Sequence, residues 1–335
     1  MSRRFSFGLA VWLVAAAVPV AFALPGCGAE PAASSPAADA AATDGAAAAD
    51  STSAADGAAT AADAADAGPA KPQPPQAPVF AGTCPDLQTG LAEFSVGGHT
   101  RRAEVYLPDS PSGAGVLFLW HGLGDSAKNF ANGMGAKAMA NTLGLIVVVP
   151  NSCCAYPVQK ACCNQLTAWN FVSEFDRDLS LFDGLLSCLD QQHSIDRGRV
   201  YSSGFSAGAL WTTFLIMNRS EYLAAAGPMS GGINNFNPWT APKRPIPVID
   251  TSGGPTDVFG NGLIDFQAST ADLNAELTKG GHFVVHCQHE LGHTVPAKMA
   301  MFVMEFLAAH RWGDSQSPMA QGLPATAPAG CKTVK

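Results

Sequence analysis

Basic residues are scarce in this chain. Its 335 residues include 19 lysines and arginines against 27 aspartates and glutamates, which gives a formal net charge of −8. Much of the acidic excess lies near the N-terminus, and no basic patch is visible anywhere along the sequence. A nucleic-acid-binding surface needs such a patch, so the composition excludes nucleic acid as a partner.

A long apolar run occupies residues 7–24, after Arg3 and Arg4 and before Leu-Pro-Gly-Cys at residues 24–27. This is the pattern of a secretory signal, and its end resembles a bacterial lipobox in which Cys27 becomes the lipidated first residue. We predict a lipoprotein-type signal over residues 1–27 and attachment to a membrane through lipid on Cys27. Cleavage without lipid is the alternative, so the expected location is the periplasm, the outer membrane or cell surface, or the medium.

Aromatic residues are absent from residues 28–78, which consist mainly of Ala, Asp, Ser, Gly and Pro. Such a segment cannot bury enough apolar surface to offset its chain entropy, and we predict a disordered tether. Residues 79–313 are long enough for one large domain with a substantial core. Residues 314–335 form a C-terminal tail that is again rich in Ala, Pro and Gly.

The chain has nine cysteines, of which Cys27 is assigned to the lipobox. Export to an oxidising compartment makes disulfides the expected state of the other eight. We expect the vicinal pairs at 153–154 and 162–163 to cross-link each other, and Cys84 to pair with Cys331. A metal cluster is the alternative for the vicinal pairs, but their spacing fits no common zinc module.

Strand and helix patterns alternate along the domain without a detectable repeat. Residues 91–96 and 102–107 predict an antiparallel pair, because apolar and polar residues alternate. Further strands are predicted over residues 116–120, 145–149, 199–203, 223–229, 247–251 and 283–287, and helices over residues 127–143, 179–189, 209–217, 268–277 and 296–310. This order predicts an α/β fold with a mostly parallel central sheet, helices on both faces, and the site at the carboxyl ends of the strands.

The segment Gly204-Phe205-Ser206-Ala207-Gly208 follows a predicted strand and precedes a predicted helix. That context is the one a nucleophile elbow requires, because the sharp turn exposes the serine hydroxyl and the glycines admit the strained backbone. We predict Ser206 as a nucleophile; an idle serine in a glycine-rich turn is the alternative.

A serine nucleophile needs a histidine base and an acid, in the chain order Ser, Asp, His for this fold. Asp257 follows the strand at residues 247–251 and is the predicted acid, whereas its competitor Asp250 lies within that strand. His293 is the predicted base, because it lies in the loop between the last strand and the last helix. The other histidines of this region are His282, His286 and His289.

The segment from His289 to His293 also matches the zinc-hydrolase pattern H-E-x-x-H. In a zinc hydrolase both histidines must lie on one face of a helix, but Gly292 interrupts the segment and Pro296 indicates that a helix begins after it. The sequence offers no third ligand at the expected spacing. We predict no metal, with a zinc metallohydrolase as a rival hypothesis.

The oxyanion hole is predicted from two backbone N–H groups. His121-Gly122-Leu123-Gly124 follows a predicted strand, so the N–H near Leu123 and that of Ala207, just after the nucleophile, can converge on a carbonyl oxygen. His121 itself is expected to support the loop.

Several segments together resemble α/β-hydrolase esterases of the polyhydroxybutyrate-depolymerase, feruloyl-esterase and related carbohydrate-esterase group. They are VLFLWHGLGDSAKNF, AWNF, SIDRGRVYSSGFSAGALW, PVIDTSGGPTD and GHTVP, and they span most of the predicted domain. The resemblance implies the α/β-hydrolase fold, a triad of Ser206, Asp257 and His293, and Trp169 as a wall of the substrate cleft. A plain core position is the alternative for Trp169. One departure is Ser252-Gly253-Gly254, where the family usually has His-Gly.

The predicted function is a secreted or lipid-anchored serine esterase that needs no cofactor. Its substrates would be carboxylic esters, such as polyhydroxyalkanoate, feruloyl or acetyl esters, including polymeric or polysaccharide-linked ones. Besides the zinc enzyme, the rival hypotheses are a serine peptidase of the same fold and a surface lipoprotein that binds without catalysis.

Overall fold

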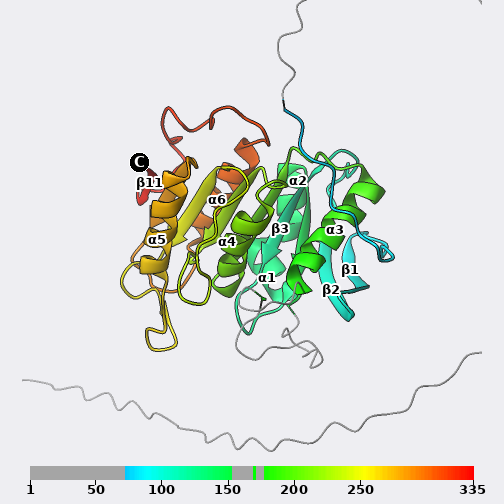
Figure 1. Cartoon of the computed structure of the whole chain (residues 1–335), viewed down its shortest axis with the longest axis horizontal. Coiled ribbons are helices and arrows are strands. Elements are labelled where there is room, and N and C mark those ends of the chain that lie inside the picture. Colours follow the sequence, from blue (N-terminus) through cyan, green and yellow to red (C-terminus); the bar gives the residue numbers. More distant parts are fainter. Residues whose placement is uncertain (1–71, 153–168, 171–176) are drawn as a thin grey trace, which may run out of the picture. The chain divides into compact units, whose positions relative to one another are not determined.

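The computed structural model describes residues 72–152, 169–170 and 177–335 (Figure 1). The predicted signal, most of the predicted tether and the two vicinal cysteine pairs lie outside these residues. The strands are β1 (Gly90–Val96), β2 (His99–Tyr106), β3 (Gly115–Trp120), β4 (Leu145–Pro150), β5 (Val200–Phe205), β6 (Ala225–Met229), β7 (Val248–Ser252), β8 (Val258–Phe259), β9 (Ile264–Asp265), β10 (Val284–Gln288) and β11 (Cys331–Val334). The helices are α1 (Ala127–Met134), α2 (Ala136–Leu143), α3 (Arg177–His193), α4 (Ala207–Arg219), α5 (Phe266–Lys279) and α6 (Ala297–Ala309).

Nine of these strands form one sheet, in the order β1-β2-β4-β3-β5-β6-β7-β10-β11. The strands from β4 to β10 in this order run parallel, while β1, β2 and β11 are antiparallel to their neighbours. In Figure 1, β1 and β11 lie at opposite ends of the sheet. The predicted α/β class and the mostly parallel sheet are confirmed.

Both faces of the sheet are buried, which explains why its central strands are continuous apolar runs. Alternate residues of β3 point to opposite faces: Phe118 and Trp120 pack in one cluster with α3, α4 and α5, and Leu117 and Leu119 pack in the other with α1, α2 and α6. Helices α3, α4 and α5 can be followed across one face in Figure 1. The helices connect the parallel strands, so the carboxyl ends of β3, β5, β6, β7 and β10 meet at one edge.

The helix predicted over residues 127–143 is two helices, α1 and α2. Gly135 lies between them with φ 68°, and its N–H donates to the carbonyls of Ala131 and Asn132. Helices commonly end at a residue in this left-handed conformation, and glycine adopts it without steric strain because it has no Cβ. The hairpin β8–β9 and the strand β11 were not predicted, since neither carries an alternating apolar pattern.

The disulfides within the described residues differ from the expected pairing. Cys84 is bonded to Cys188 of α3, and Cys287 of β10 is bonded to Cys331 of β11. The expected Cys84–Cys331 pair is therefore wrong. The reason is the C-terminal tail, which returns to the sheet as β11 and sets Cys331 directly opposite Cys287 in the antiparallel register.

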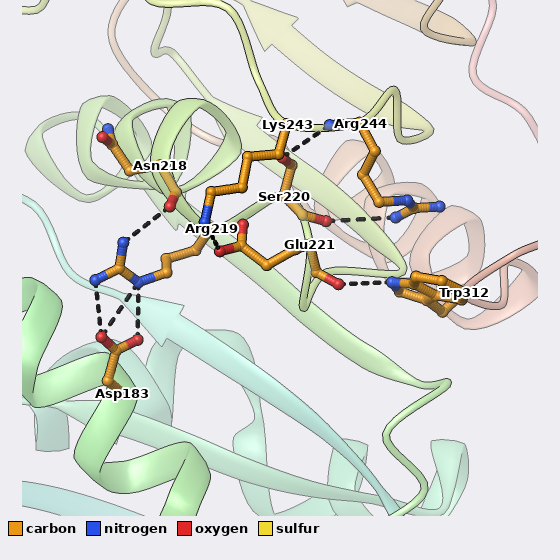
Figure 2. Close-up of polar contacts among 8 residues, drawn as sticks. All are labelled: Asp183, Asn218, Arg219, Ser220, Glu221, Lys243, Arg244 and Trp312. Carbon is orange, nitrogen blue, oxygen red and sulfur yellow. Dashed lines mark hydrogen bonds and ion pairs between the residues drawn. The ribbon is translucent and has the colours of Figure 1, made fainter. Parts of the chain in front are cut away.

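The edge opposite the carboxyl ends of the parallel strands is held by polar contacts (Figure 2). Arg219, in the last turn of α4, makes hydrogen bonds of 2.8–3.2 Å to both carboxylate oxygens of Asp183 on α3. The guanidinium of Arg244 lies 4.6 Å from the ring centroid of Trp312, whose indole N–H donates to the Glu221 carbonyl at 2.7 Å. These contacts fix the C-terminal end of α4, whereas Ala207 lies at its N-terminal end.

Across the described ranges, every helix is too short or too polar to span a lipid bilayer.

Candidate active site

Ser206 occupies the turn between β5 and α4. Its backbone has φ 57° and ψ −119°, a conformation that non-glycine residues rarely adopt and that costs on the order of 1–3 kcal/mol. The side chain makes no capping hydrogen bond to α4, although serine is a favoured capping residue. Its hydroxyl is directed instead to a histidine, so the strain serves the placement of the hydroxyl.

The two glycines of the elbow are required by close packing. A Cβ on Gly208 would lie 1.9 Å from the carbonyl oxygen of Trp120, and a Cβ on Gly204 would lie 2.5 Å from the carbonyl oxygen of Gly208. Both distances are far below van der Waals contact. The glycines therefore let the start of α4 pack directly against the end of β3.

Ser206, His293 and Asp257 form a continuous chain of hydrogen bonds. The Ser206 hydroxyl lies 2.8 Å from His293 Nε2, and His293 Nδ1 lies 2.7 Å from Asp257 Oδ1. With Nδ1 protonated, the imidazole donates to the carboxylate and accepts from the hydroxyl. The Asp257 side chain is fully buried, while that of His293 is 23% exposed. The structure thus brings together the three residues that the sequence predicted.

The second oxygen of Asp257 is held by two further donors. Ser230 Oγ donates to Asp257 Oδ2 at 2.8 Å, and the Gly253 N–H donates to the same oxygen at 2.7 Å. Ser230 follows the last residue of β6 and has φ 53°. Sequence reasoning missed this serine. The sequence feature that could have identified it is a Ser-Gly-Gly segment directly after a buried strand, at the same sheet edge as Ser206, Asp257 and His293.

The segment that matches H-E-x-x-H lies in a loop. Residues 289–293 lie between β10 and α6 and outside any helix, since α6 begins at Ala297. Gly292 has φ 69°, and its N–H donates to the Gly253 carbonyl at 3.0 Å, which ties the loop to the segment after β7. Both ring nitrogens of His293 lie within hydrogen-bond distance of the triad partners. The segment does not have the helical spacing that a zinc hydrolase uses.

Asp250, the competing acid, forms a separate pair with His286. The two residues lie opposite each other on the parallel strands β7 and β10, and His286 Nδ1 lies 2.6 Å from Asp250 Oδ1. Burial raises the pKa of Asp250, and the hydrogen bonds from His286 and Asn274 oppose that shift. Its carboxylate is engaged away from Ser206, as expected for a local structural contact.

The loop after β3 lies against the nucleophile. A Cβ on Gly122 would lie 3.5 Å from both Ser206 Cβ and the Phe205 carbonyl oxygen. Leu123 is the next residue of that loop. Ala207 is the first residue of α4, so its N–H has no partner within the helix. The two predicted oxyanion donors therefore belong to segments that flank Ser206.

His121 supports this loop from within. Its Nδ1–H donates to the Gly122 carbonyl at 2.8 Å, and its Nε2 accepts from the Ser152 N–H at 3.1 Å. Burial lowers the pKa of His121, which keeps the imidazole neutral and able to accept. The ring thereby joins the ends of β3 and β4.

Trp169 does not form an exposed wall in this structure. Its side chain is fully buried, and its indole N–H donates to the His121 carbonyl at 2.8 Å. Its ring meets that of Trp120 edge to face, with centroids 4.9 Å apart. The predicted cleft residue instead packs behind the loop that carries Leu123.

A buried ion pair holds the chain on both sides of the Cys-rich segment. Arg101 and Asp178 are both fully buried and lie 2.7 Å apart. Arg101 also donates to the Asn151 carbonyl, and Asp178 Oδ2 accepts from the Asn170 N–H at 2.7 Å. Asn170 adjoins Trp169, so this pair also fixes the support of the loop after β3.

Several exposed apolar side chains belong to the segments that follow the carboxyl ends of the parallel strands, including the hairpin β8–β9. These segments follow β3, β6, β7 and β10, and they carry Leu123, Phe236, Val258, Phe259, Leu263 and Leu291. Exposed large apolar groups near a site are candidates for contact with an apolar ligand.

Comparison with known proteins finds esterases. No family model matches the chain. The chain is 26% identical over 165 residues to feruloyl esterase D of Neurospora crassa, a match that covers 45% of this chain and 52% of that protein. It is 29% identical over 127 residues to poly(3-hydroxyalkanoate) depolymerase C of Paucimonas lemoignei, covering 36% and 29% of the two chains. The chain thus spans about half, or less, of the length of these curated relatives.

Solved structures show the same fold. The native structure of a protein named sOPH has a TM-score of 0.62 and 20% identity, and the match covers 75% of this chain and 96% of that one. The native structure of pOPH has a TM-score of 0.61 and 20% identity, with 75% and 97% covered. The fold is the α/β-hydrolase fold, and the similarity to esterases that the motifs indicated is confirmed.

Proposed function

We propose that this protein is a serine hydrolase of carboxylic esters. The observation that carries the proposal is the hydrogen-bonded chain of Ser206, His293 and Asp257, at 2.8 and 2.7 Å, on a strained strand-to-helix turn. The arrangement matches the geometry by which this triad is recognised on unrelated folds. The similarity to feruloyl esterase D and to a polyhydroxyalkanoate depolymerase gives independent support.

The residues define a sequence of proton transfers. His293 takes the proton of Ser206 as the serine oxygen attacks the ester carbonyl, and Asp257 holds the imidazole in the tautomer that can accept it. The N–H groups of Leu123 and Ala207 stabilise the negative charge on the carbonyl oxygen. His293 then gives the proton to the leaving alcohol, and water hydrolyses the acyl-enzyme by the same steps.

The proposed substrates are esters with an apolar part, which include polyhydroxyalkanoate and feruloyl esters, polymeric or linked to polysaccharide. Support comes from the exposed apolar side chains on the segments that follow the carboxyl ends of the parallel strands. A large apolar group gains free energy on contact with such a surface, at roughly 25 cal/mol per Å² buried. Acetyl esters offer little apolar area and are the poorer candidates in this respect.

The proposed setting is outside the cytoplasm, with Cys27 carrying a lipid and residues 28–78 acting as the tether. The disulfides Cys84–Cys188 and Cys287–Cys331 support export, because such bonds persist in oxidising compartments.

Hydrolysis of p-nitrophenyl acetate and butyrate by the wild type and by Ser206→Ala tests the reaction. We expect activity in the wild type, a higher kcat/KM for butyrate, and a loss of at least about 1,000-fold in kcat in the variant. A fluorophosphonate should label the wild type and leave Ser206→Ala unlabelled.

The same assay separates the rival functions. Activity that a chelator abolishes, or a Ser206→Ala variant as active as the wild type, would exclude the serine mechanism. Labelling together with faster cleavage of peptides than of esters would indicate a peptidase. His289→Ala is the matched control for a zinc site, and we expect it to retain activity while His293→Ala loses it.

A further inference from the structure

The imidazole of His293 lies against two phenyl rings. The ring of Phe266 is stacked on it, with centroids 4.5 Å apart and planes at 12°. The ring of Phe205 has its centroid 4.7 Å away and its plane at 30°. One phenyl ring is thus stacked on the imidazole and the other is tilted against it.

Each ring is attached to the backbone beside another member of the triad. Phe205 is the last residue of β5 and directly precedes Ser206. Phe266 is the first residue of α5, is 1% exposed, and its N–H donates to the Asp257 carbonyl at 2.9 Å. The backbone that carries each ring is thus joined to the backbone of Ser206 or Asp257, so the two rings place the imidazole relative to both residues.

We infer that Phe205 and Phe266 are positioning residues that also favour the charged form of His293 during the reaction. This inference rests on the proposed function. As Ser206 attacks the ester carbonyl, its O–H bond breaks and the proton moves to His293 Nε2, which makes the imidazole a cation. The faces of a phenyl ring attract a cation and have little such attraction for a neutral ring.

The cation–π part of the attraction arises only once the proton has moved, so it acts on the transition state and not on the bound ester. Interactions of this kind raise kcat and leave KM unchanged. A cation–π contact that stabilises the transition state typically raises kcat by a factor of about 2 to 30.

The test is the pair kcat and KM for p-nitrophenyl butyrate in Phe266→Leu. Leucine keeps an apolar contact with the imidazole but has no π face. We expect kcat to fall about fivefold while KM stays within about twofold of the wild type. Phe302→Leu is the matched control, because Phe302 is 2% exposed on α6 and packs in the core on the other face of the sheet. It should lose stability and keep kcat.

Phe205→Leu provides a second variant in case Phe266→Leu does not fold, and the same fall in kcat is expected. If the wild type is active and both variants fold but keep the wild-type kcat, the inference is wrong while the proposed function stands. An inactive wild type would overturn the proposed function together with the inference, so the two failures are distinguishable.

Discussion

Ser230 donates its hydroxyl to Asp257 from the end of the neighbouring strand, at 2.8 Å. Asp257 is fully buried, so an oxygen that loses a donor there has no solvent to replace it. We predict that Ser230→Ala lowers kcat about tenfold with KM nearly unchanged, because only the Gly253 N–H remains to orient that oxygen. Ser203→Ala is the control: its hydroxyl is equally buried but donates to the Gly227 carbonyl. An equal loss of kcat in both variants would contradict the prediction.

Asp250 and Asp257 each pair with a histidine, yet among the described residues only the Asp257 pair contacts Ser206. Asp257→Asn should lower kcat by about 10³ to 10⁴, because the imidazole then loses its required tautomer. Asp250→Asn should leave kcat within about threefold and lower the free energy of unfolding by about 1–3 kcal/mol. Steady-state kinetics and urea unfolding of the two variants give both quantities. The assignment of the acid fails if Asp250→Asn is the more damaging change in kcat.

Trp169 is expected to act on the oxyanion loop through its hydrogen bond to His121. Trp169→Phe removes that donor from a buried carbonyl, so we expect kcat to fall several-fold and KM to change little. Trp211→Phe is a close control, because the Trp211 indole N–H has no hydrogen-bond partner among the described residues. If Trp169 instead lines the substrate cleft, Trp169→Phe should raise KM and leave kcat unchanged.

Acid should destabilise the fold through His282. Burial lowers the pKa of His282 to about 4 from its ordinary 6.5. A group whose folded pKa is depressed contributes stability above its unfolded pKa, and this is lost as the pH falls from about 6.5 towards 4. The full effect is at most about 3 kcal/mol. We predict that His282→Gln flattens the dependence of the urea midpoint on pH between 7 and 4.5. An unchanged slope in that variant would assign the acid sensitivity to other groups, such as His310, whose pKa burial also lowers.

The three residues of the hydrogen-bonded chain could be named from the sequence because each lies at a place that the chain order defines. Ser206 lies between a strand and a helix, Asp257 follows β7, and His293 follows β10. Local patterns identify these places without any knowledge of contacts. The broken helix at Gly135 was missed because its apolar spacing continues across the break, while the left-handed turn leaves no mark on that spacing.

Contacts between distant segments could not be read from the sequence. Ser230 reaches Asp257, and Phe266 stacks on His293, only because neighbouring strands bring their carboxyl ends together. The pairing of Cys331 failed for the same reason: the tail that carries it has the composition of a linker, and only the sheet edge gives it a strand partner. Such partners depend on tertiary packing, which outweighs local preference.

The bond between Cys287 and Cys331 ties β11 to β10, and β10 would otherwise be an edge strand of the sheet. An uncovered β10 would present the backbone groups of Val284–Gln288 as an open sheet edge, which is a template for pairing with another chain. Strand β11 covers that edge and is itself short, with Lys332 exposed on it. A reducing environment that frees this strand would expose the backbone groups of β10 to pairing with other chains.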